Sequence, residues 1–486
     1  MQLLREHPRS GEYRNFIDGR FVDLQENSLD VANPATLEVI ARVPESGARV
    51  VDEAVQAAKK AQPAWEKLPA IERARHLRTI AAKVRENAEA LARLITLEQG
   101  KILPLALVEV NFTADYIDYM AEWARRIEGE VLTSDRAGES IFLLRKPIGV
   151  TAGILPWNFP FFLIARKLAP ALVTGNTIVI KPSEETPLNA FAFAELVAET
   201  DLPAGVFNLV GGTGAKTGAE LAGHKDVGLV SFTGSVETGK KIMQTAASNL
   251  TRINLELGGK APAIVLADAN LDLAAKAIYD SRVINTGQVC NCAERVYVHS
   301  SVAGPFLDRI TRLMRETRYG DPLAEQDLHM GPLINRAGLD KVSAAVEGAR
   351  AAGGEVVTGG KQATGRRGYH YEPTVVVNCR ADMEIMRKEV FGPVLPIQTV
   401  SSLEEAVELS NDSDYGLTSS IFTNDLNSAM RACRDLRFGE TYVNREHFEA
   451  MQGFHAGRRK SGIGGADGKH GLYEYTETHA IYLQHG

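Results

Sequence analysis

Two residue types with complementary chemistry stand in glycine-rich segments of this chain. Cys290 lies in the stretch NTGQVCNC, and Glu256 lies 34 residues upstream in the stretch LELGGK. A cysteine attacks a carbonyl carbon as the thiolate, and the thioester left after oxidation is released by a water molecule that a carboxylate of raised pKa activates. Taken singly, a cysteine is more often a small buried residue and a glutamate is usually solvated. The pair predicts covalent oxidation of an aldehyde, provided that the surrounding motifs agree.

Glycine-rich turns after predicted strands indicate a nucleotide site. The segment LVSFTGSVETG is typical of a strand, a turn at Gly234 and Ser235, and a helix start whose backbone amides face a pyrophosphate. Gly214 and Gly218 repeat this pattern upstream. A tight turn without a ligand is the alternative interpretation of each segment taken alone.

The segment IVIKPSE ends a predicted strand with Lys181 and Glu184. A lysine and a carboxylate at the carboxyl end of a parallel strand suit the hydroxyl groups of a ribose. Because an anionic Glu184 would repel a 2′-phosphate, this segment favours NAD over NADP.

An asparagine stands in a bend between two prolines. In the segment LPWNFP, the flanking prolines hold Asn158 in a non-helical conformation at the end of a predicted strand. Its side-chain amide could stabilise an oxyanion, whereas the ordinary interpretation is a turn asparagine.

A scaffold of alternating strands and helices must position these motifs. Short β-rich runs at 148–155, 177–180, 206–210 and 227–232 alternate with helix-like segments at 190–200 and 214–222, which predicts βαβ units and a parallel sheet. Strands at 263–266, 295–298, 374–377 and 393–397 predict a second α/β set. Upstream, Phe16–Val22 carries a hairpin signal, and apolar spacing predicts helices over 50–68, 71–98 and 105–127.

Size and composition narrow the classes of function. A chain of 486 residues predicts about two or three domains. The hydrophobic content of 44% and the charged content of 24% are those of a globular protein, and a net charge of −7 gives no basic surface for nucleic acid. No apolar signal segment or membrane span is expected, because charges and a proline interrupt the apolar run 159–173.

The cysteines are too few for a disulfide framework. They stand at 290, 292, 379 and 433, which fits a reducing, cytoplasmic setting. Cys290 and Cys292 could in principle bind a metal, but no second pair stands at ligand spacing, so no metal site is predicted.

With these motifs in order, the chain resembles the aldehyde dehydrogenase superfamily over nearly its whole length. The resemblance rests on PWNFP, IVIKPSE, FTGS, LELGGK, GQxC, EVFGPV and the late KSG segment. It implies that Cys290 is the nucleophile, Glu256 the general base, and Asn158 with the Cys290 backbone amide the oxyanion hole. It also implies that NAD is contacted by Leu155, Trp157, Lys181, Glu184, Gly214, Gly218, Ser235, Glu389 and Phe391.

The resemblance also implies an α/β architecture of three parts. These are a Rossmann-type NAD-binding domain of residues 1–127 and 148–257, a catalytic domain of residues 258–460, and a small β flap of residues 128–147 and 475–486. The flap implies a homodimer or homotetramer. Because members that transfer the acyl group to coenzyme A tend to lack the base, Glu256 favours release of a carboxylic acid.

The expected substrate tunnel departs from members that prefer hydrophobic aldehydes. Beside Phe159, this chain places the polar residues Arg166, Asn291, Glu449 and His455. Unpaired polar groups against an aliphatic chain cost about 1 to 3 kcal/mol each, which favours a small 2-hydroxyaldehyde such as lactaldehyde or glycolaldehyde. The stretches 113–126 and 448–455 are similar to those of bacterial family members that act on these two aldehydes.

Three alternatives stay open at this point. Arg166 and Glu449 could pair with each other and seal the tunnel wall. Arg166 could instead anchor the carboxylate of a semialdehyde such as succinate semialdehyde. A binding or structural protein that retained the fold without turnover is the alternative of another class, which the joint presence of Cys290, Glu256 and Asn158 disfavours.

Overall fold

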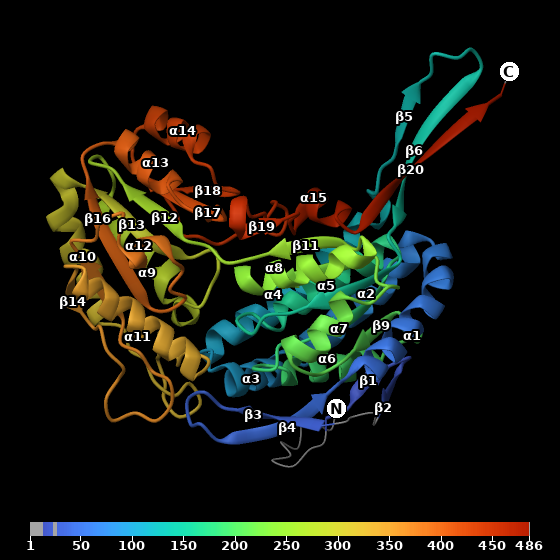
Figure 1. Cartoon of the computed structure of the whole chain (residues 1–486), viewed down its shortest axis with the longest axis horizontal. Coiled ribbons are helices and arrows are strands. Elements are labelled where there is room, and N and C mark those ends of the chain that lie inside the picture. Colours follow the sequence, from blue (N-terminus) through green and yellow to red (C-terminus); the bar gives the residue numbers. More distant parts are fainter. Residues whose placement is uncertain (1–12, 23–26, 486) are drawn as a thin grey trace.

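The computed structural model describes residues 13–22 and 27–485. Its strands form an eight-stranded sheet, a seven-stranded sheet, a three-stranded arm and the hairpin of β3 (Asn27–Ala32) and β4 (Val39–Glu45) (Figure 1). The predicted α/β fold class is confirmed. The predicted domain ranges include residues 1–12, 23–26 and 486, which lie outside the described residues.

The eight-stranded sheet has the order β19-β11-β10-β7-β8-β9-β1-β2. Its strands are β1 (Asn15–Ile17), β2 (Arg20–Val22), β7 (Val150–Ile154), β8 (Thr177–Lys181), β9 (Phe207–Leu209), β10 (Leu229–Thr233), β11 (Arg252–Glu256) and β19 (Gly462–Ile463). The run from β11 to β9 is parallel, and the predicted hairpin forms β1 and β2 with Asp18 and Gly19 at positive φ in the turn.

Helices cover both faces of this sheet because successive strand residues point to opposite sides. In β8, Ile178 and Ile180 enter the core beneath α2 to α6, whereas Val179 enters the core beneath α1, α7 and α8. The helices are α1 (Ala48–Lys67), α2 (Ala70–Glu86), α3 (Ala88–Gln99), α4 (Leu103–Ala121), α5 (Phe162–Thr174), α6 (Leu188–Ala198), α7 (Ala219–Ala222) and α8 (Val236–Ala246).

Two predicted helices differ in detail from the structure. The continuous helix expected over 71–98 is wrong, because Asn87 leaves the helical conformation at φ −116° and ψ 14° and its side chain donates to the carbonyl of Lys83. The segment 214–222 begins with a π-helical turn, Gly214–Gly218, before α7. The apolar period survives such breaks, so periodicity alone did not locate them.

The seven-stranded sheet has the order β14-β15-β16-β13-β12-β17-β18 and is parallel except at β14. Its strands are β12 (Ala261–Val265), β13 (Ala293–His299), β14 (Glu355–Thr358), β15 (Thr374–Val377), β16 (Val394–Val400), β17 (Thr418–Phe422) and β18 (Glu440–Val443). One face packs against α9 (Leu271–Val283) and α10 (Ala303–Arg315). The other packs against α11 (Arg336–Ala351), α13 (Leu403–Asn411) and α14 (Leu426–Asp435), and the short α12 (Glu384–Arg387) follows β15.

The last part of the chain returns to the first sheet. The short strand β19 pairs antiparallel with β11, with Leu255 opposite Ile463 and Glu256 opposite Gly462. The backbone amide of Leu257 donates to the carbonyl of Ser461 at 2.9 Å, and α15 (Gly468–Tyr473) packs against α5. The strand that carries Glu256 is therefore held on both sides.

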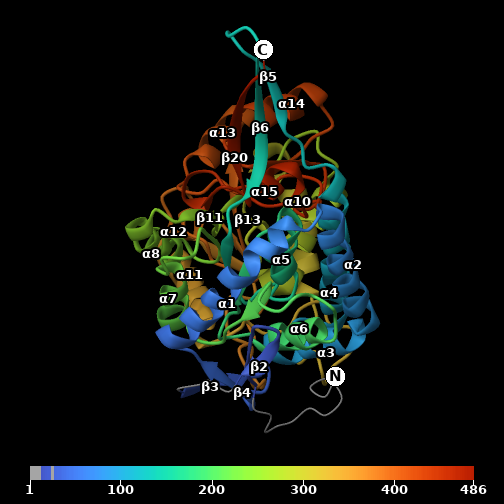
Figure 2. The same cartoon turned by 90° about the vertical axis from the view of Figure 1, so that its right-hand side faces the viewer.

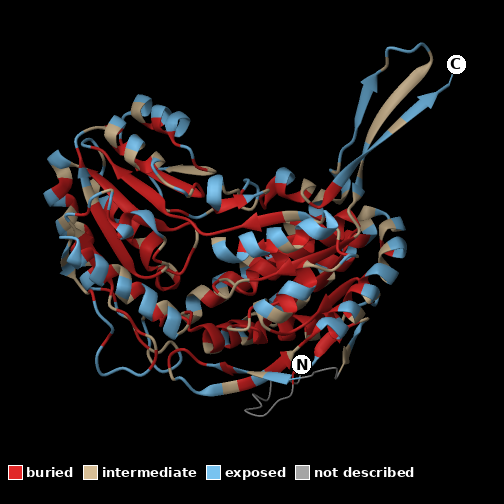
Figure 3. Cartoon of the chain, in the orientation of Figure 1, coloured by how far each residue is buried: buried red, intermediate tan, exposed pale blue. Residues whose placement is uncertain are grey.

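The three-stranded arm projects beyond both sheets (Figures 1 and 2). It consists of β5 (Glu130–Thr133), β6 (Glu139–Pro147) and β20 (Thr476–Gln484), all antiparallel. The two large sheets are buried, whereas the arm is exposed or half-buried along most of its length (Figure 3). Among the described residues, no helix is long and apolar enough to cross a membrane.

Candidate active site

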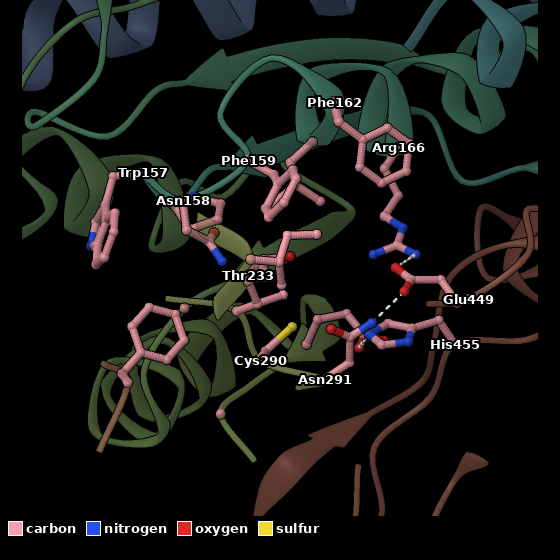
Figure 4. Close-up of a pocket in the computed structure, with 18 of the residues that line it drawn as sticks. Trp157, Asn158, Phe159, Phe162, Arg166, Thr233, Cys290, Asn291, Glu449 and His455 are labelled. Carbon is pink, nitrogen blue, oxygen red and sulfur yellow. Dashed lines mark hydrogen bonds and ion pairs between the residues drawn. The ribbon is translucent and has the colours of Figure 1, made fainter. Parts of the chain in front are cut away.

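A cavity of about 280 Å³ lies at the carboxyl ends of the parallel strands of the eight-stranded sheet, on the side that faces the seven-stranded sheet. Of the residues singled out in the sequence, it is lined by Trp157, Asn158, Phe159, Arg166, Ser235, Glu256, Cys290, Asn291, Glu389, Phe391, Glu449 and His455 (Figure 4). The remaining five, Leu155, Lys181, Glu184, Gly214 and Gly218, lie outside this lining. The structure thus brings the predicted nucleophile, base and polar tunnel residues into one cavity.

Cys290 follows a strained loop. Asn285, Thr286 and Gly287 all adopt positive φ, at 47°, 61° and 73°. The Gln288 side chain holds the loop, since its Nε2 donates to the Asn285 carbonyl at 3.1 Å and its Oε1 accepts from the Ile334 amide at 2.9 Å. Backbone held in sparsely populated conformations is found at functional sites, where the surroundings maintain it.

The second cysteine of the segment is in a different environment. Cys292 is buried, and its Sγ accepts from the Arg282 guanidinium at 2.8 Å. Burial raises the pKa of Cys292 to about 12, so this group remains a thiol near neutral pH. Cys290 is partly exposed and lines the cavity, which makes it the residue of this segment that an aldehyde could reach.

Glu256 ends β11 inside the cavity with 3% of its surface exposed. Neither carboxylate oxygen has a hydrogen-bond partner among the described residues, and His455 Nε2 lies 3.6 Å from Oε2. Burial raises its pKa to about 7, although His455 and Lys167 oppose the shift. A carboxylate with this pKa can take a proton from water near neutral pH.

Asn158 is held by residues far away in the sequence. Its backbone carbonyl accepts from Lys101 Nζ at 2.8 Å and from Asn285 Nδ2 at 3.0 Å. Lys101 forms a buried ion pair with Glu109, whose Oε1 accepts from the amide of Phe161 at 2.9 Å. These contacts hold the bend in place, and the Lys101–Glu109 pair could not be predicted from the sequence because neither residue stands in a motif.

The Asn158 side chain reaches the nucleophile loop. Its Nδ2 donates to the Gln288 carbonyl at 3.0 Å. Because an amide nitrogen carries two N–H groups, one donor remains for an oxygen in the cavity.

One wall of the cavity consists of charged and polar groups (Figure 4). The Arg166 guanidinium donates to Glu449 Oε1 at 3.0 Å, and the other oxygen of Glu449 accepts from Asn291 Nδ2. The pairing of Arg166 with Glu449, one of the alternatives that the sequence left open, is therefore present, yet both side chains still line the cavity. Asp467, which the sequence analysis missed, is a second partner of Arg166.

His455 completes this wall. Its Nδ1 lies 2.7 Å from Glu440 Oε1, and its side chain is 1% exposed. Burial opposes the charged imidazolium, yet the adjacent Glu440 carboxylate raises the pKa of His455 well above its ordinary value. His455 is therefore a cation beside Glu256, and Glu440 lies on a separate strand, β18, that no motif marked.

The residues expected at the nucleotide lie at or after the carboxyl ends of β8, β9 and β10. Lys181 Nζ forms an ion pair with Glu184 Oε2 at 2.9 Å, and Glu184 Oε1 accepts from the Gly214 amide at 3.0 Å. The Gly218 amide donates to the Thr213 carbonyl at 3.1 Å. The predicted ribose partners are thus adjacent to one of the predicted glycine turns.

The side of the cavity where the nicotinamide is expected contains hydroxyl groups and two aromatic rings. Thr233 Oγ1 has no hydrogen-bond partner within the described part of the chain, and it lines the cavity together with Ser235, the N-cap of α8. Trp157 and Phe391 meet edge to face at 5.5 Å between ring centroids. These positions fit a nicotinamide nucleotide, which needs hydrogen bonds to its polar groups and a flat apolar contact for its ring.

Two further expected cofactor residues have structural partners. Leu155 is buried, and its amide donates to the Lys181 carbonyl at 3.0 Å, which ties the bend after β7 to β8. Glu389 Oε1 accepts from the Gly259 amide at 2.7 Å, and burial raises the pKa of Glu389. Among residues 13–22 and 27–485, no group of His, Cys, Asp and Glu side chains is arranged to bind a metal.

A doubly wound sheet with a pocket at the carboxyl ends of its strands is an architecture in which dinucleotide cofactors bind. Residues 21–481 match the aldehyde dehydrogenase family, and the chain belongs to that family. Lactaldehyde dehydrogenase of Escherichia coli is 60% identical over 470 residues, which cover 96% of this chain and 98% of the relative. The resemblance found in the sequence is confirmed.

A relative with another substrate and two solved structures are also similar to this chain. The 3,6-anhydro-alpha-L-galactose dehydrogenase of Vibrio sp. is 41% identical over 475 residues, covering 97% of this chain and 99% of that protein. The crystal structure of E. coli lactaldehyde dehydrogenase superposes with a TM-score of 0.96, covering 97% of this chain and 99% of that chain at 60% identity. Betaine aldehyde dehydrogenase of Staphylococcus aureus in complex with NAD+ has a TM-score of 0.96 at 36% identity, covering 100% and 97% of the two chains.

Proposed function

We propose that this aldehyde dehydrogenase oxidises small 2-hydroxyaldehydes, lactaldehyde and glycolaldehyde, to the carboxylic acids with NAD. The observation that carries the proposal is the polar wall of Arg166, Glu449, Asn291 and His455 within the cavity that contains Cys290. The 60% identity to E. coli lactaldehyde dehydrogenase supports the same substrate class.

The reaction begins at Cys290. Its thiolate forms a bond to the aldehyde carbon, and the free donor of the Asn158 amide and the Cys290 backbone amide stabilise the resulting oxyanion. When bound, the oxidised nicotinamide supplies the acceptor for the hydride of the aldehyde carbon. The acyl group then remains on Cys290 as a thioester.

Glu256 completes the cycle. Its carboxylate, with a pKa of about 7, accepts a proton from a water molecule that attacks the thioester carbon. The carbon–sulfur bond breaks, the electron pair returns to Cys290 as thiolate, and the acid leaves. The Glu256 carboxylate is buried without a hydrogen-bond partner among the described residues, and the free-energy cost of this burial is difficult to explain in a protein without turnover.

The polar wall selects the substrate by hydrogen bonding. A 2-hydroxyl group can accept from His455 or donate to Glu449, whose oxygens accept from Arg166 and Asn291 and retain further lone pairs, whereas an alkyl chain offers these groups no hydrogen bond. The semialdehyde alternative requires an arginine that can bind a carboxylate. Arg166 already has two carboxylate partners, Glu449 and Asp467, which disfavours that alternative.

The choice of cofactor rests on Glu184. Its carboxylate, close to the Gly214 turn, would hydrogen-bond the hydroxyls of an adenine ribose and repel a 2′-phosphate. We further propose that residues 1–127 and 148–257 form the NAD-binding domain and residues 258–460 the catalytic domain. In this proposal the arm, residues 128–147 and 475–486, joins copies of the chain into a dimer or tetramer, and its exposed Val131, Tyr482 and Leu483 suit such a contact.

Initial rates of NADH formation test the proposal. Lactaldehyde, glycolaldehyde, succinate semialdehyde and hexanal are compared in parallel, first with NAD and then with NADP. The proposal predicts high kcat/KM for the two hydroxyaldehydes with NAD. A preference for succinate semialdehyde would make Arg166 a carboxylate anchor, and a preference for hexanal would mean that the charges of the wall only neutralise one another.

A further inference from the structure

A buried aspartate stands directly behind the polar wall. Asp467 lies between β19 and α15 with 1% of its surface exposed, and it is absent from the cavity lining. Its Oδ1 accepts from Arg166 Nε at 3.0 Å, and its Oδ2 accepts from Arg166 Nη2. Two adjacent donors of the guanidinium are thus directed away from the cavity, to the carboxylate behind it.

The backbone of Asp467 has an unusual conformation for an aspartate. It adopts φ 71° and ψ 160°, a region that glycine occupies freely and other residues occupy at a cost. Three glycines, Gly464, Gly465 and Gly468, stand within three residues of this position. A glycine would satisfy the backbone here, so the benefit of an aspartate must come from its side chain.

The Asp467 side chain changes the formal charge around Arg166. Arg166 carries one positive charge and faces two carboxylates, those of Glu449 and Asp467. These three groups together are therefore net negative. Without Asp467, Arg166 and Glu449 would form a neutral pair, and the positive charge of Arg166 would face one carboxylate instead of two.

We infer that Asp467 is a positioning residue that determines the charge of the accepted substrate, by holding Arg166 and cancelling its capacity to bind a carboxylate-bearing aldehyde. Held in this way, Arg166 orients Glu449, and Glu449 orients Asn291 beside the nucleophile. The inference rests on the proposed function in that it concerns selection within the same cavity. It assigns the exclusion of semialdehydes to a residue that no substrate touches.

The test is Asp467→Asn, which removes the charge and keeps the shape. The kcat and KM for lactaldehyde and for succinate semialdehyde are measured for the wild type and the variant. The ratio of kcat/KM for the semialdehyde to that for lactaldehyde is expected to rise about tenfold or more, chiefly through a lower KM for the semialdehyde. An unchanged ratio, or a parallel fall of kcat for both substrates, would overturn the inference.

Two further variants separate charge from folding. Asp467→Gly removes the carboxylate and accepts the backbone conformation without strain, so it is expected to fold and to change the ratio in the same direction. In the double variant Arg166→Met/Asp467→Asn, the rise in the kcat/KM ratio for the semialdehyde should disappear, because the guanidinium that would bind its carboxylate is absent. A gain that persists in the double variant would show that Arg166 is not the group that Asp467 controls.

A binding measurement keeps this inference distinguishable from the proposed function. Succinate is used to protect Cys290 from alkylation by iodoacetamide, which requires no turnover. Stronger protection in Asp467→Asn than in the wild type supports the inference even if the wild type proves inactive on lactaldehyde, which would overturn the proposed function alone. Equal protection in both proteins would overturn the inference and leave the proposed function standing.

Discussion

Replacing Glu256 with glutamine should make the folded protein more stable at pH 8 than the wild type, while the difference at pH 5 should be small. The folded-state pKa of Glu256 is about 7, against an ordinary value of 4.5. A raised pKa means that the folded chain binds the proton more tightly than the unfolded chain. The stability contribution of this group is therefore fully present below pH 4.5 and is lost as the pH rises to about 7.

The size of the effect follows from the two pKa values. One pKa unit corresponds to about 1.36 kcal/mol, so the ionised carboxylate destabilises the folded wild type by about 3 kcal/mol at pH 8. Part of this loss is already present at pH 5, where the unfolded chain is ionised. The stability advantage of Glu256→Gln should thus grow by about 2 to 3 kcal/mol between pH 5 and pH 8.

Urea-induced unfolding, followed by tryptophan fluorescence at both pH values and one protein concentration, measures this difference. Glu408→Gln serves as the matched control, because Glu408 is exposed on α13 and lies outside the cavity. If Glu256→Gln and the wild type differ by the same amount at pH 5 and pH 8, Glu256 ionises in the folded protein as it does in water. Glu256 would then not be a base with a raised pKa.

Three other predictions address the chemistry of the site. Cys290→Ala should abolish NADH formation while NAD binding persists in calorimetry, and turnover comparable to wild type would instead direct attention to another thiol. His455→Gln removes a cation 3.6 Å from Glu256, so the acidic limb of the kcat profile should move about 1 to 3 pH units upward; a limb that stays in place would separate His455 from the base. Glu184→Gln should shift the ratio of kcat/KM for NADP over NAD upward by about tenfold, and a constant ratio would remove Glu184 from cofactor selection.

The sequence predicted the residues of the site better than it predicted their supports. Cys290, Glu256 and Asn158 stand in short motifs whose local backbone, a strand end or a turn, directs each side chain toward the carboxyl edge of a sheet. Lys101 donates to the carbonyl of Asn158, 57 positions away, and Asp467 accepts from Arg166, 301 positions away. Such contacts depend on how α5, α15 and the bend after β7 pack together, and no periodicity or spacing carries that information.

The same distinction applies to the fold. Parallel strands and their crossover helices were predictable, because each is a local pattern of apolar residues between turns. The break at Asn87 and the strand β19 were not predictable. A single side-chain contact accompanies the end of α2 at Asn87, and β19 is a strand only because it pairs with the distant β11. Polar groups in the tunnel were predictable as residues, but the pairing of Arg166 with Asp467 required the structure.

The pairing of β19 with β11 has a consequence for how the chain acquires its shape during synthesis. Strand β11, which ends in Glu256, is synthesised before the seven-stranded sheet, but its outer edge stays unpaired until residues 462 and 463 of β19 have been synthesised. Between the synthesis of β11 and that of β19, the ribosome must produce the whole seven-stranded sheet, which consists of strands β12 to β18. The segments that form the eight-stranded sheet are therefore separated in the chain by the seven-stranded sheet, and an unfinished chain presents an open strand edge beside the carboxylate of Glu256.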